Sequence, residues 1–315
     1  MVFTNFFAAR ASYFCFKKGG VMKNQDWIQP TLYPFRHRYM QLRQGQMHYI
    51  DEGQGETIVF VHGTPTWSFL YRDFIKSLST QYRCIAIDHL GFGLSDKPKN
   101  FVGTPQAHSQ NLEEFIDRLG LENVTLVVHD FGGPIGLSWA IAHPEKVKRI
   151  VLFNTWLWET KTDKDAQKID KLLHGWLGNY LYLNTNFSPK VLLKQAFFDK
   201  KKLNKSVHRH YLKPFPNKAS RYGLLKIGQS LVGSSDWYQQ QFEQIDQIKD
   251  RPLLILWGMQ DKFIRPTYLQ KWVKALPQAK VVELQAGHFV QEEAPQAAIT
   301  AIGKFMLQAA PLTLK

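Results

Sequence analysis

Six short apolar runs, each ended by glycine or a polar residue, constrain the fold of this chain more than any other feature. Their sequences are "TIVFVHG", "YRCIAIDH", "VTLVVHD", "VKRIVLFN", "RPLLILWG" and "KVVELQ". Runs of this length, rich in β-branched residues and bounded by turn residues, are typical of strands. Two earlier runs, "YMQLRQG" and "QMHYIDEG", predict a hairpin. The sequence therefore predicts eight strands.

Helical patterns separate most of the later strands. Examples are "AHSQNLEEFIDRLG" and "PIGLSWAIAHP", and "PQAAITAIGKFMLQA" closes the chain. Because strands that alternate with helices pair in parallel, we expect a mostly parallel sheet with helices on both faces. The predicted class is α/β.

One interval breaks this alternation. Almost a hundred residues between Asn154 and Pro252 hold no good strand, and they are rich in Trp, Tyr, Phe and Lys. A loop of that length is not expected inside a compact domain, so the interval is interpreted as a helical cap inserted after the sixth strand. The predicted organisation is a poorly ordered N-terminal extension (1–30), a core (31–154 and 250–315) and a cap (155–249).

Composition narrows the functional classes. Two cysteines, Cys15 and Cys84, give no disulfide framework and favour a cytoplasmic protein. No run of about 18 apolar residues predicts a membrane span. The formal charge of +14, from 40 Lys and Arg against 26 Asp and Glu, is spread over surface-type positions, so nucleic acid is not an expected partner. Weak association with an anionic membrane surface stays open. Residues 1–21, aromatic and basic without an acid, lack the apolar region and cleavage site of a signal peptide.

The stretch "VVHDFGGPIG" places an acid where a strand turns sharply into a helix. In the related pattern G-x-S-x-G, a nucleophilic serine occupies that apex; here the residue is Asp130. Asp261 follows the strand "LLILWG", and His288 follows "KVVELQ". All three come from the carboxyl ends of predicted parallel strands, the edge at which open α/β sheets bind ligands. Their order in the chain is nucleophile, acid, histidine.

With these residues in place, the chain resembles the α/β-hydrolase fold, and within it the haloalkane dehalogenases and their epoxide-hydrolase relatives. The resemblance extends from about Tyr39 to the C-terminus. The motifs that carry it are "HGTPTWSFLYR", "IDHLGFGLSDKP", "HDFGGPIGLSWA", "WGMQDKF" and "GHFVQEEAP".

The resemblance implies a two-step hydrolysis without metal or cofactor. An aspartate is already anionic at pH 7, so Asp130 attacks a saturated carbon and forms an ester. His288 then activates water, and Asp261 orients the imidazole and balances its charge. The backbone N–H groups of Thr64 and Phe131 form the oxyanion hole. Asn154 stands at the family's alternative position for the acid, where it cannot carry the charge and is expected to support the triad.

The leaving-group site departs from the family. Dehalogenases of this kind hold the halide with a tryptophan after the nucleophile and with an asparagine after the His-Gly pair or a cap tryptophan. Here Phe131 and Thr64 occupy the first two places. A phenyl ring has no N–H to donate. The candidates for a replacement donor are Trp156, Trp158 and Trp176.

Three functions therefore stay open. A dehalogenase-like hydrolase acting on a small hydrophobic molecule is favoured by the motifs. An epoxide or β-lactone hydrolase would use the same aspartate with a proton donor from the cap, for which the candidates are Tyr180, Tyr182, Tyr211 and Tyr222. A non-catalytic ligand-binding protein of the same fold is disfavoured by the complete set of Asp130, Asp261 and His288.

Overall fold

Eight strands form one twisted sheet in the computed structural model, which describes residues 26–307. The strands are β1 (Arg38–Leu42), β2 (Gly45–Glu52), β3 (Thr57–Val61), β4 (Arg83–Ile87), β5 (Val124–Val128), β6 (Val147–Leu152), β7 (Leu253–Gly258) and β8 (Lys280–Leu284). Their order in the sheet is β1-β2-β4-β3-β5-β6-β7-β8. Only β2 runs antiparallel to its neighbours β1 and β4, and the remaining pairs are parallel. The predicted eight-stranded, mostly parallel sheet is confirmed.

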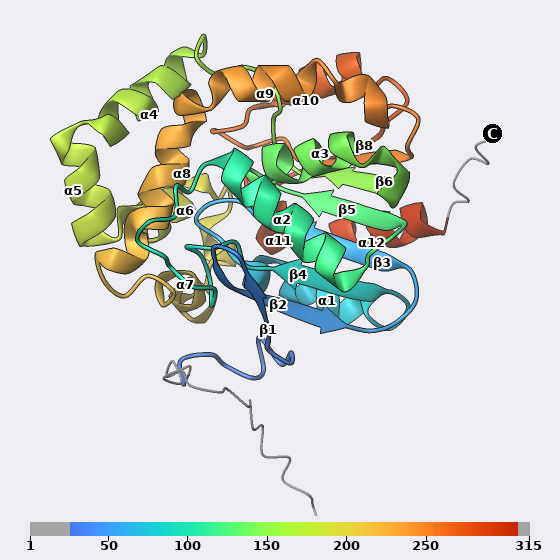
Figure 1. Cartoon of the computed structure of the whole chain (residues 1–315), viewed down its shortest axis with the longest axis horizontal. Coiled ribbons are helices and arrows are strands. Elements are labelled where there is room, and N and C mark those ends of the chain that lie inside the picture. The colour runs from blue at the N-terminus through green and yellow to red at the C-terminus, as the bar shows by residue number, and fades with distance from the viewer. Residues whose placement is uncertain (1–25, 308–315) are drawn as a thin grey trace, which may run out of the picture.

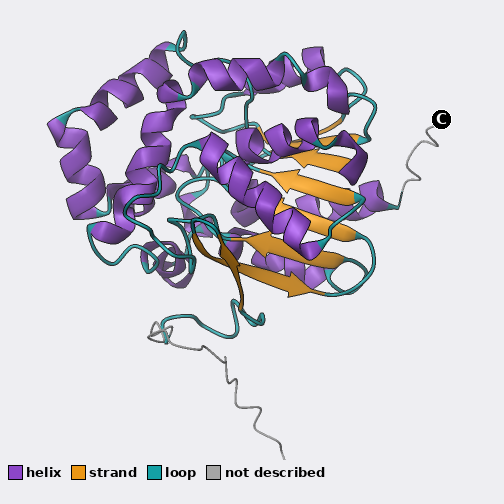
Figure 2. Cartoon of the chain, viewed as in Figure 1, coloured by secondary structure: helices purple, strands orange, loops and turns teal. Residues whose placement is uncertain are grey.

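Helices cover both faces of the sheet (Figures 1 and 2). On one face lie α2 (Pro105–Leu119), α3 (Gly132–Ala142) and α10 (Pro266–Ala275), and on the other lie α1 (Arg72–Leu78), α11 (Val290–Glu293) and α12 (Pro295–Met306). Side chains of a strand alternate between these two cores: Leu126 and Val128 face α2 and α3, whereas Val127 faces α1 and α12. Because both faces are covered, β5 is buried along its whole length, as its unbroken apolar sequence predicts.

The interval between β6 and β7 is helical, without a strand. It contains α4 (Lys164–His174), α5 (Trp176–Thr185), α6 (Leu193–Ala196), α7 (Lys205–Leu212), α8 (Tyr222–Gly233) and α9 (Ser235–Phe242). We call residues 155–249 the insertion. In Figure 2 the central parallel strands point toward the side of the molecule where its helices gather. Within the described chain, no helix is both long and apolar enough to cross a membrane.

The N-terminal boundary of the packed body lies earlier than the sequence indicated. Trp27, expected in a poorly ordered extension, packs edge-on against Trp67 with ring centroids 5.9 Å apart. The backbone N–H of Gln29 donates to His210 Nε2 of α7 over 3.1 Å. Residues 26–30 therefore contact both the core and the insertion. Packing against Trp67 removes apolar surface of the Trp27 ring from water, which stabilises this position. The rest of the expected extension, residues 1–25, lies outside the described part.

Candidate active site

Asp130 occupies a sharp turn between β5 and α3. Its φ is +53°, in the left-handed region that non-glycine residues seldom adopt. The turn is held from both sides, since the Asp130 N–H donates to Asn154 O over 2.9 Å and Thr155 Oγ1 donates to Asp130 O over 2.6 Å. Such a conformation costs on the order of 1–3 kcal/mol and persists where the surroundings fix it.

Two glycines make room for this turn. A Cβ on Gly63 would lie 2.1 Å from Asp130 Oδ1, and one on Gly132 would lie 2.2 Å from Val61 O. Both distances are far inside van der Waals contact. The glycines of "HGTP" and "HDFGG" therefore allow the loop after β3 to approach the Asp130 carboxylate closely.

The Asp130 carboxylate lies among donors. The N–H of Thr64 donates to Oδ1 over 2.7 Å, and the N–H of Phe131 also donates to the carboxylate. Oδ2 lies 3.5 Å from His288 Nε2. Burial would raise the pKa of Asp130, but the hydrogen bond and charge of His288 outweigh it, so the pKa is lowered and the side chain is anionic at neutral pH.

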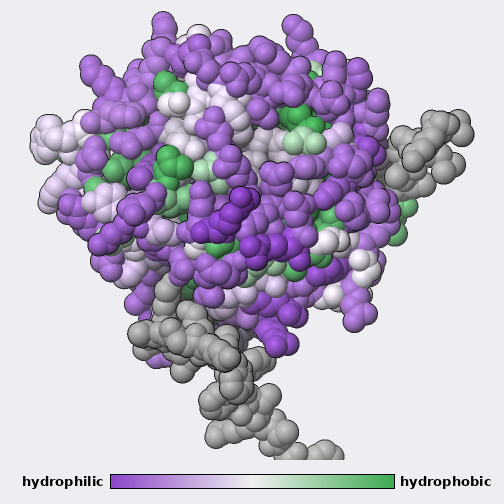
Figure 3. All heavy atoms as spheres, in the orientation of Figure 1, coloured by the Kyte–Doolittle hydropathy of each residue, from purple (hydrophilic) through white to green (hydrophobic). Residues whose placement is uncertain are grey.

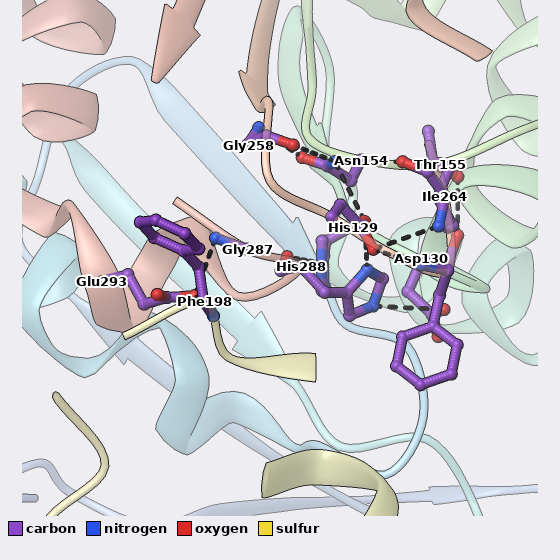
Figure 4. A network of polar contacts seen from close by, with 12 residues as sticks. His129, Asp130, Asn154, Thr155, Phe198, Gly258, Ile264, Gly287, His288 and Glu293 are labelled. Atoms are coloured by element: carbon purple, nitrogen blue, oxygen red, sulfur yellow. Dashed lines mark hydrogen bonds and ion pairs between the residues drawn. The ribbon is translucent and has the colours of Figure 1, made fainter. Parts of the chain in front are cut away.

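His288 lies between the carboxylates of Asp130 and Asp261. Figure 4 shows its ring beside Asp130. Its Nδ1 donates to Asp261 Oδ2 over 2.8 Å. Burial lowers the pKa of His288, but the charge of Asp261 and the interactions with Asp130 raise it above its ordinary value. Both carboxylates therefore favour the protonated imidazole in this arrangement.

Asp261 is fixed by the loop that carries it and by Asn154. Its Oδ1 accepts the backbone N–H groups of Phe263 and Ile264 over 2.8 and 3.1 Å. Asn154 Nδ2 donates to Asp261 Oδ2 over 3.0 Å, and Asn154 Oδ1 accepts the N–H of Gly258 over 2.8 Å. The structure thus brings together Asp130, His288, Asp261 and Asn154 from the ends of four strands.

Three further side chains hold this arrangement, and sequence reasoning did not assign them. His129 Nε2 donates to the carbonyl of His288 over 2.9 Å, and burial lowers the pKa of His129 to about 3, which keeps it neutral. Thr155 supports the turn at Asp130 as described above. Glu293 accepts the N–H of Gly287 over 2.8 Å. His129 and Glu293 lie inside the motifs "HDFGG" and "GHFVQEEAP", and that adjacency to Asp130 and His288 was the available signal.

A cavity of about 450 Å³ opens onto Asp130 and His288 between the core and the insertion. Its walls are mainly apolar and include Phe131, Trp156, Leu173, Tyr182, Phe187, Leu193, Leu231, Ile264 and Phe289. Two polar atoms of lining residues are buried without a hydrogen-bond partner in the described chain, namely Trp156 Nε1 and Thr64 Oγ1. Both belong to residues that line the cavity with Asp130.

Only one of the three tryptophan candidates lies at this cavity. Trp156 lines it, with its ring edge-on to Phe131 at a centroid distance of 4.9 Å. Trp158 instead packs between Tyr268 and Trp272, and neither it nor Trp176 is among the lining residues. Of the four candidate tyrosines only Tyr182 lines the cavity. Among residues 26–307 no group of three or more His, Cys, Asp or Glu side chains could hold a metal ion.

Comparison with known proteins places this geometry in a family. The profile of the alpha/beta hydrolase fold matches residues 56–295. Haloalkane dehalogenase 2 of Mycobacterium tuberculosis is 34% identical over 276 residues, which cover 87% of this chain and 96% of the relative. Cis-3-alkyl-4-alkyloxetan-2-one decarboxylase of Shewanella oneidensis is 34% identical over 288 residues, covering 88% and 90%. The crystal structure of the haloalkane dehalogenase DatA from Agrobacterium tumefaciens C58 superposes with a TM-score of 0.79 at 24% identity, over 89% of this chain and 99% of that one.

Proposed function

This chain belongs to the α/β-hydrolase fold family and is a haloalkane dehalogenase-like hydrolase, and from that premise we propose that it acts through an ester on Asp130. The observation that carries the proposal is the Asp130 carboxylate itself. It is anionic, held at the apex of a strained turn by the N–H of Thr64, and faces both His288 and an apolar cavity.

The first half-reaction is a displacement at carbon. Asp130 Oδ2 attacks a saturated carbon of a substrate held in the cavity, the bond from that carbon to the leaving group breaks, and the leaving group departs with the electron pair. No base is needed, because the lowered pKa of Asp130 keeps the carboxylate ionised. The apolar walls exclude water, which strengthens the electrostatic interactions at the reacting atoms.

The second half-reaction hydrolyses the ester. Esterification removes the negative charge of Asp130, and this lowers the pKa of His288, because one of its two carboxylate partners is gone. The neutral imidazole takes a proton from water, which attacks the carbonyl carbon of Asp130. Asp261 stabilises the imidazolium, and the N–H groups of Thr64 and Phe131 stabilise the oxyanion that forms on Oδ1. The intermediate then collapses: the bond between Asp130 Cγ and Oδ2 breaks, the imidazolium returns its proton to Oδ2, and the alcohol leaves with that oxygen while the water oxygen stays in the Asp130 carboxylate.

Trp156 and Thr64 are the residues that would stabilise the departing anion. The indole N–H of Trp156 and the hydroxyl of Thr64 are unsatisfied donors at the cavity, whereas Phe131 has no side-chain donor. A buried donor without a partner costs about 1–3 kcal/mol, and a departing anion would relieve that cost. We assign bromide, iodide or chloride displacement to this pair of donors.

Ring opening of a β-lactone is the second candidate. The observation that favours it is that relatives at 34% and 32% identity are named cis-3-alkyl-4-alkyloxetan-2-one decarboxylases. Attack of Asp130 on the saturated ring carbon bonded to the ring oxygen would break that carbon–oxygen bond. The β-lactone would open, and the carboxylate formed from the lactone would be the leaving group. Loss of carbon dioxide from that ester would then return the Asp130 carboxylate and leave an alkene. The leaving carboxylate remains part of the substrate, so this route does not require separate N–H donors that bind a halide ion.

A product screen separates the candidates. The protein is incubated with bromoalkanes, epoxides and dialkyl β-lactones, and free halide, diol, hydroxy acid, carbon dioxide and alkene are measured, with Asp130→Ala as the control. Release of bromide and alcohol supports the dehalogenase, and release of carbon dioxide and alkene supports the second candidate. Equal product release by Asp130→Ala would contradict both.

A further inference from the structure

An unpartnered apolar face lies on the insertion, outside the active site. Four large apolar side chains within nine residues are exposed: Trp176 at 81%, Tyr180 at 54%, Leu177 at 45% and Leu172 at 39%. Trp176, Leu177 and Tyr180 are spaced to share one side of α5, while Gly178, Tyr182 and Leu183 are buried. Figure 3 shows pale, weakly polar spheres at the edge of the molecule where Figure 1 places α5. We call these four residues the α5 patch.

The α5 patch is continuous with the mouth of the active-site cavity. Leu172 belongs to both, since it is exposed and also lines the cavity with its helix neighbours Lys168 and Ile169. The patch and the cavity therefore meet at Leu172.

The composition of the patch fits a lipid surface. Tryptophan and tyrosine concentrate at membrane–water interfaces, where the ring is apolar and its polar tip stays hydrated. The insertion carries 16 Lys and Arg against 8 Asp and Glu, so more than half of the net charge of +14 lies in less than a third of the chain. Lys171 is exposed directly beside Leu172. An exposed apolar patch on a segment with this net positive charge is complementary to anionic lipid.

A second copy of the chain fits the patch less well. Taking about 150–250 Å² for a large side chain, the exposed fractions amount to roughly 330–550 Å². A standard protein interface takes about 800 Å² from each partner.

We propose that the α5 patch docks this protein on an anionic lipid membrane, with the cavity mouth against the lipid surface. A hydrophobic substrate then passes from the lipid along Leu172 to Asp130. The entry route rests on the proposed function, whereas the docking does not.

Vesicle binding tests the docking directly. Co-sedimentation is measured with phosphatidylcholine vesicles and with vesicles that also contain about 30% phosphatidylglycerol. Trp176→Ser with Leu177→Ser and Tyr180→Ser should weaken binding to the anionic vesicles by at least about tenfold, and raising NaCl from about 0.05 to 0.5 M should weaken binding of the unmodified protein. The matched control is Val102→Ser with Val273→Ser and Val281→Ser. These three valines are exposed but lie outside the insertion, so this variant should bind within about twofold of the unmodified protein.

Tryptophan fluorescence locates the contact. All nine tryptophans lie within residues 26–307, and Trp176 is the only exposed one. Brominated phosphatidylglycerol should therefore quench the unmodified protein, and Trp176→Phe should keep the binding but lose most of the quenching. Equal quenching in Trp176→Phe, equal binding of the triple serine variant, or absence of binding to anionic vesicles would overturn the proposal. A concentration-dependent dimer in solution that the triple serine variant abolishes would assign the patch to a second copy instead.

Turnover separates the entry route from the chemistry. With a long-chain bromoalkane dissolved in vesicles, the triple serine variant should lose at least about fivefold in rate, while its rate on a short dissolved bromoalkane stays unchanged. Equal rates on the vesicle-borne substrate would contradict the entry route. A protein that binds vesicles but turns over neither substrate would count against the proposed function and leave the docking intact.

Discussion

Trp156 is the residue whose loss should affect departure of the leaving group alone. Its indole N–H is buried and unsatisfied at the cavity, and its ring lies edge-on to Phe131. Trp156→Phe should lower kcat/KM for a bromoalkane by about 10²-fold, the lower end of the effect of removing one aimed donor. The same change at Trp158, two residues on but outside the cavity, is the matched control and should cost less than about threefold. Equal losses in the two variants would contradict the assignment.

His288 should give the two half-reactions different pH dependences. In the ester, Asp261 alone still raises the pKa of His288, and the fraction of neutral imidazole grows as the pH rises. Ester formation needs only ionised Asp130, whose pKa is lowered, and should stay constant between about pH 6 and 9. Ester hydrolysis should slow as the pH falls over the same range. Rapid-quench kinetics measure both steps, and a burst that also declines toward low pH would show that His288 acts in the first step.

At the scale of elements, Glu293 of α11 joins the His288 loop to the insertion. Its carboxylate accepts the N–H of Gly287 and, over 3.2 Å, the N–H of Phe198 (Figure 4). It also accepts the N–H of Asp199 over 2.8 Å. The N–H of His288 donates to Ala196 O over 3.0 Å. The segment after α6 and the catalytic loop are thus fixed to each other, so Glu293 positions His288 rather than touching substrate.

Glu293→Gln should therefore impair only the second half-reaction. A glutamine keeps one acceptor oxygen but presents an NH₂ group to the N–H of Asp199, which loosens the loop. We expect ester hydrolysis to slow by about tenfold and ester formation to change by less than about twofold, so the intermediate accumulates. Glu283→Gln, at an exposed position on β8, is the control. Equal slowing of both steps would indicate a general structural role instead.

At the scale of the whole molecule, a buried ion pair ties the core to the insertion. Arg72 donates to both oxygens of Glu292 over 2.5 and 2.6 Å, and the hydroxyl of Tyr211 in α7 donates to the same carboxylate. Burial would lower the pKa of Arg72, but the charge of Glu292 raises it, so the guanidinium is charged at neutral pH. Removing one partner leaves a buried charge alone.

Glu292→Gln should reduce the free energy of unfolding by about 3–5 kcal/mol. Urea denaturation followed by circular dichroism measures the change. The exposed pair of Lys249 with Asp246 provides the comparison, and Asp246→Asn should cost less than about 1 kcal/mol. A cost as small as that of the exposed pair would show that Glu292 is hydrated or protonated in the folded protein.

The sheet and the positions of Asp130, Asp261 and His288 could be predicted because the signals are local in the sequence. A buried strand is an apolar run, and each of these residues follows the end of its strand by two to four positions. The roles of Trp156, Trp158 and Trp176 could not be separated in this way. All three are tryptophans of the insertion, and nothing in the sequence tells them apart. In the structure Trp156 packs against Phe131, Trp158 packs against Trp272, and Trp176 is exposed to solvent. Glu293 was missed because two of its three N–H partners, those of Phe198 and Asp199, belong to the insertion and come near it only in the folded protein.

Trapping the ester on Asp130 tests the central claim most directly. His288→Phe is mixed with a bromoalkane that the unmodified protein hydrolyses, and the intact protein is weighed by mass spectrometry. Because attack needs no base while hydrolysis does, we predict a stoichiometric gain of one alkyl group on Asp130, absent from the His288→Phe, Asp130→Asn double variant. Absence of the adduct, with a substrate that the unmodified protein turns over, would contradict the ester mechanism.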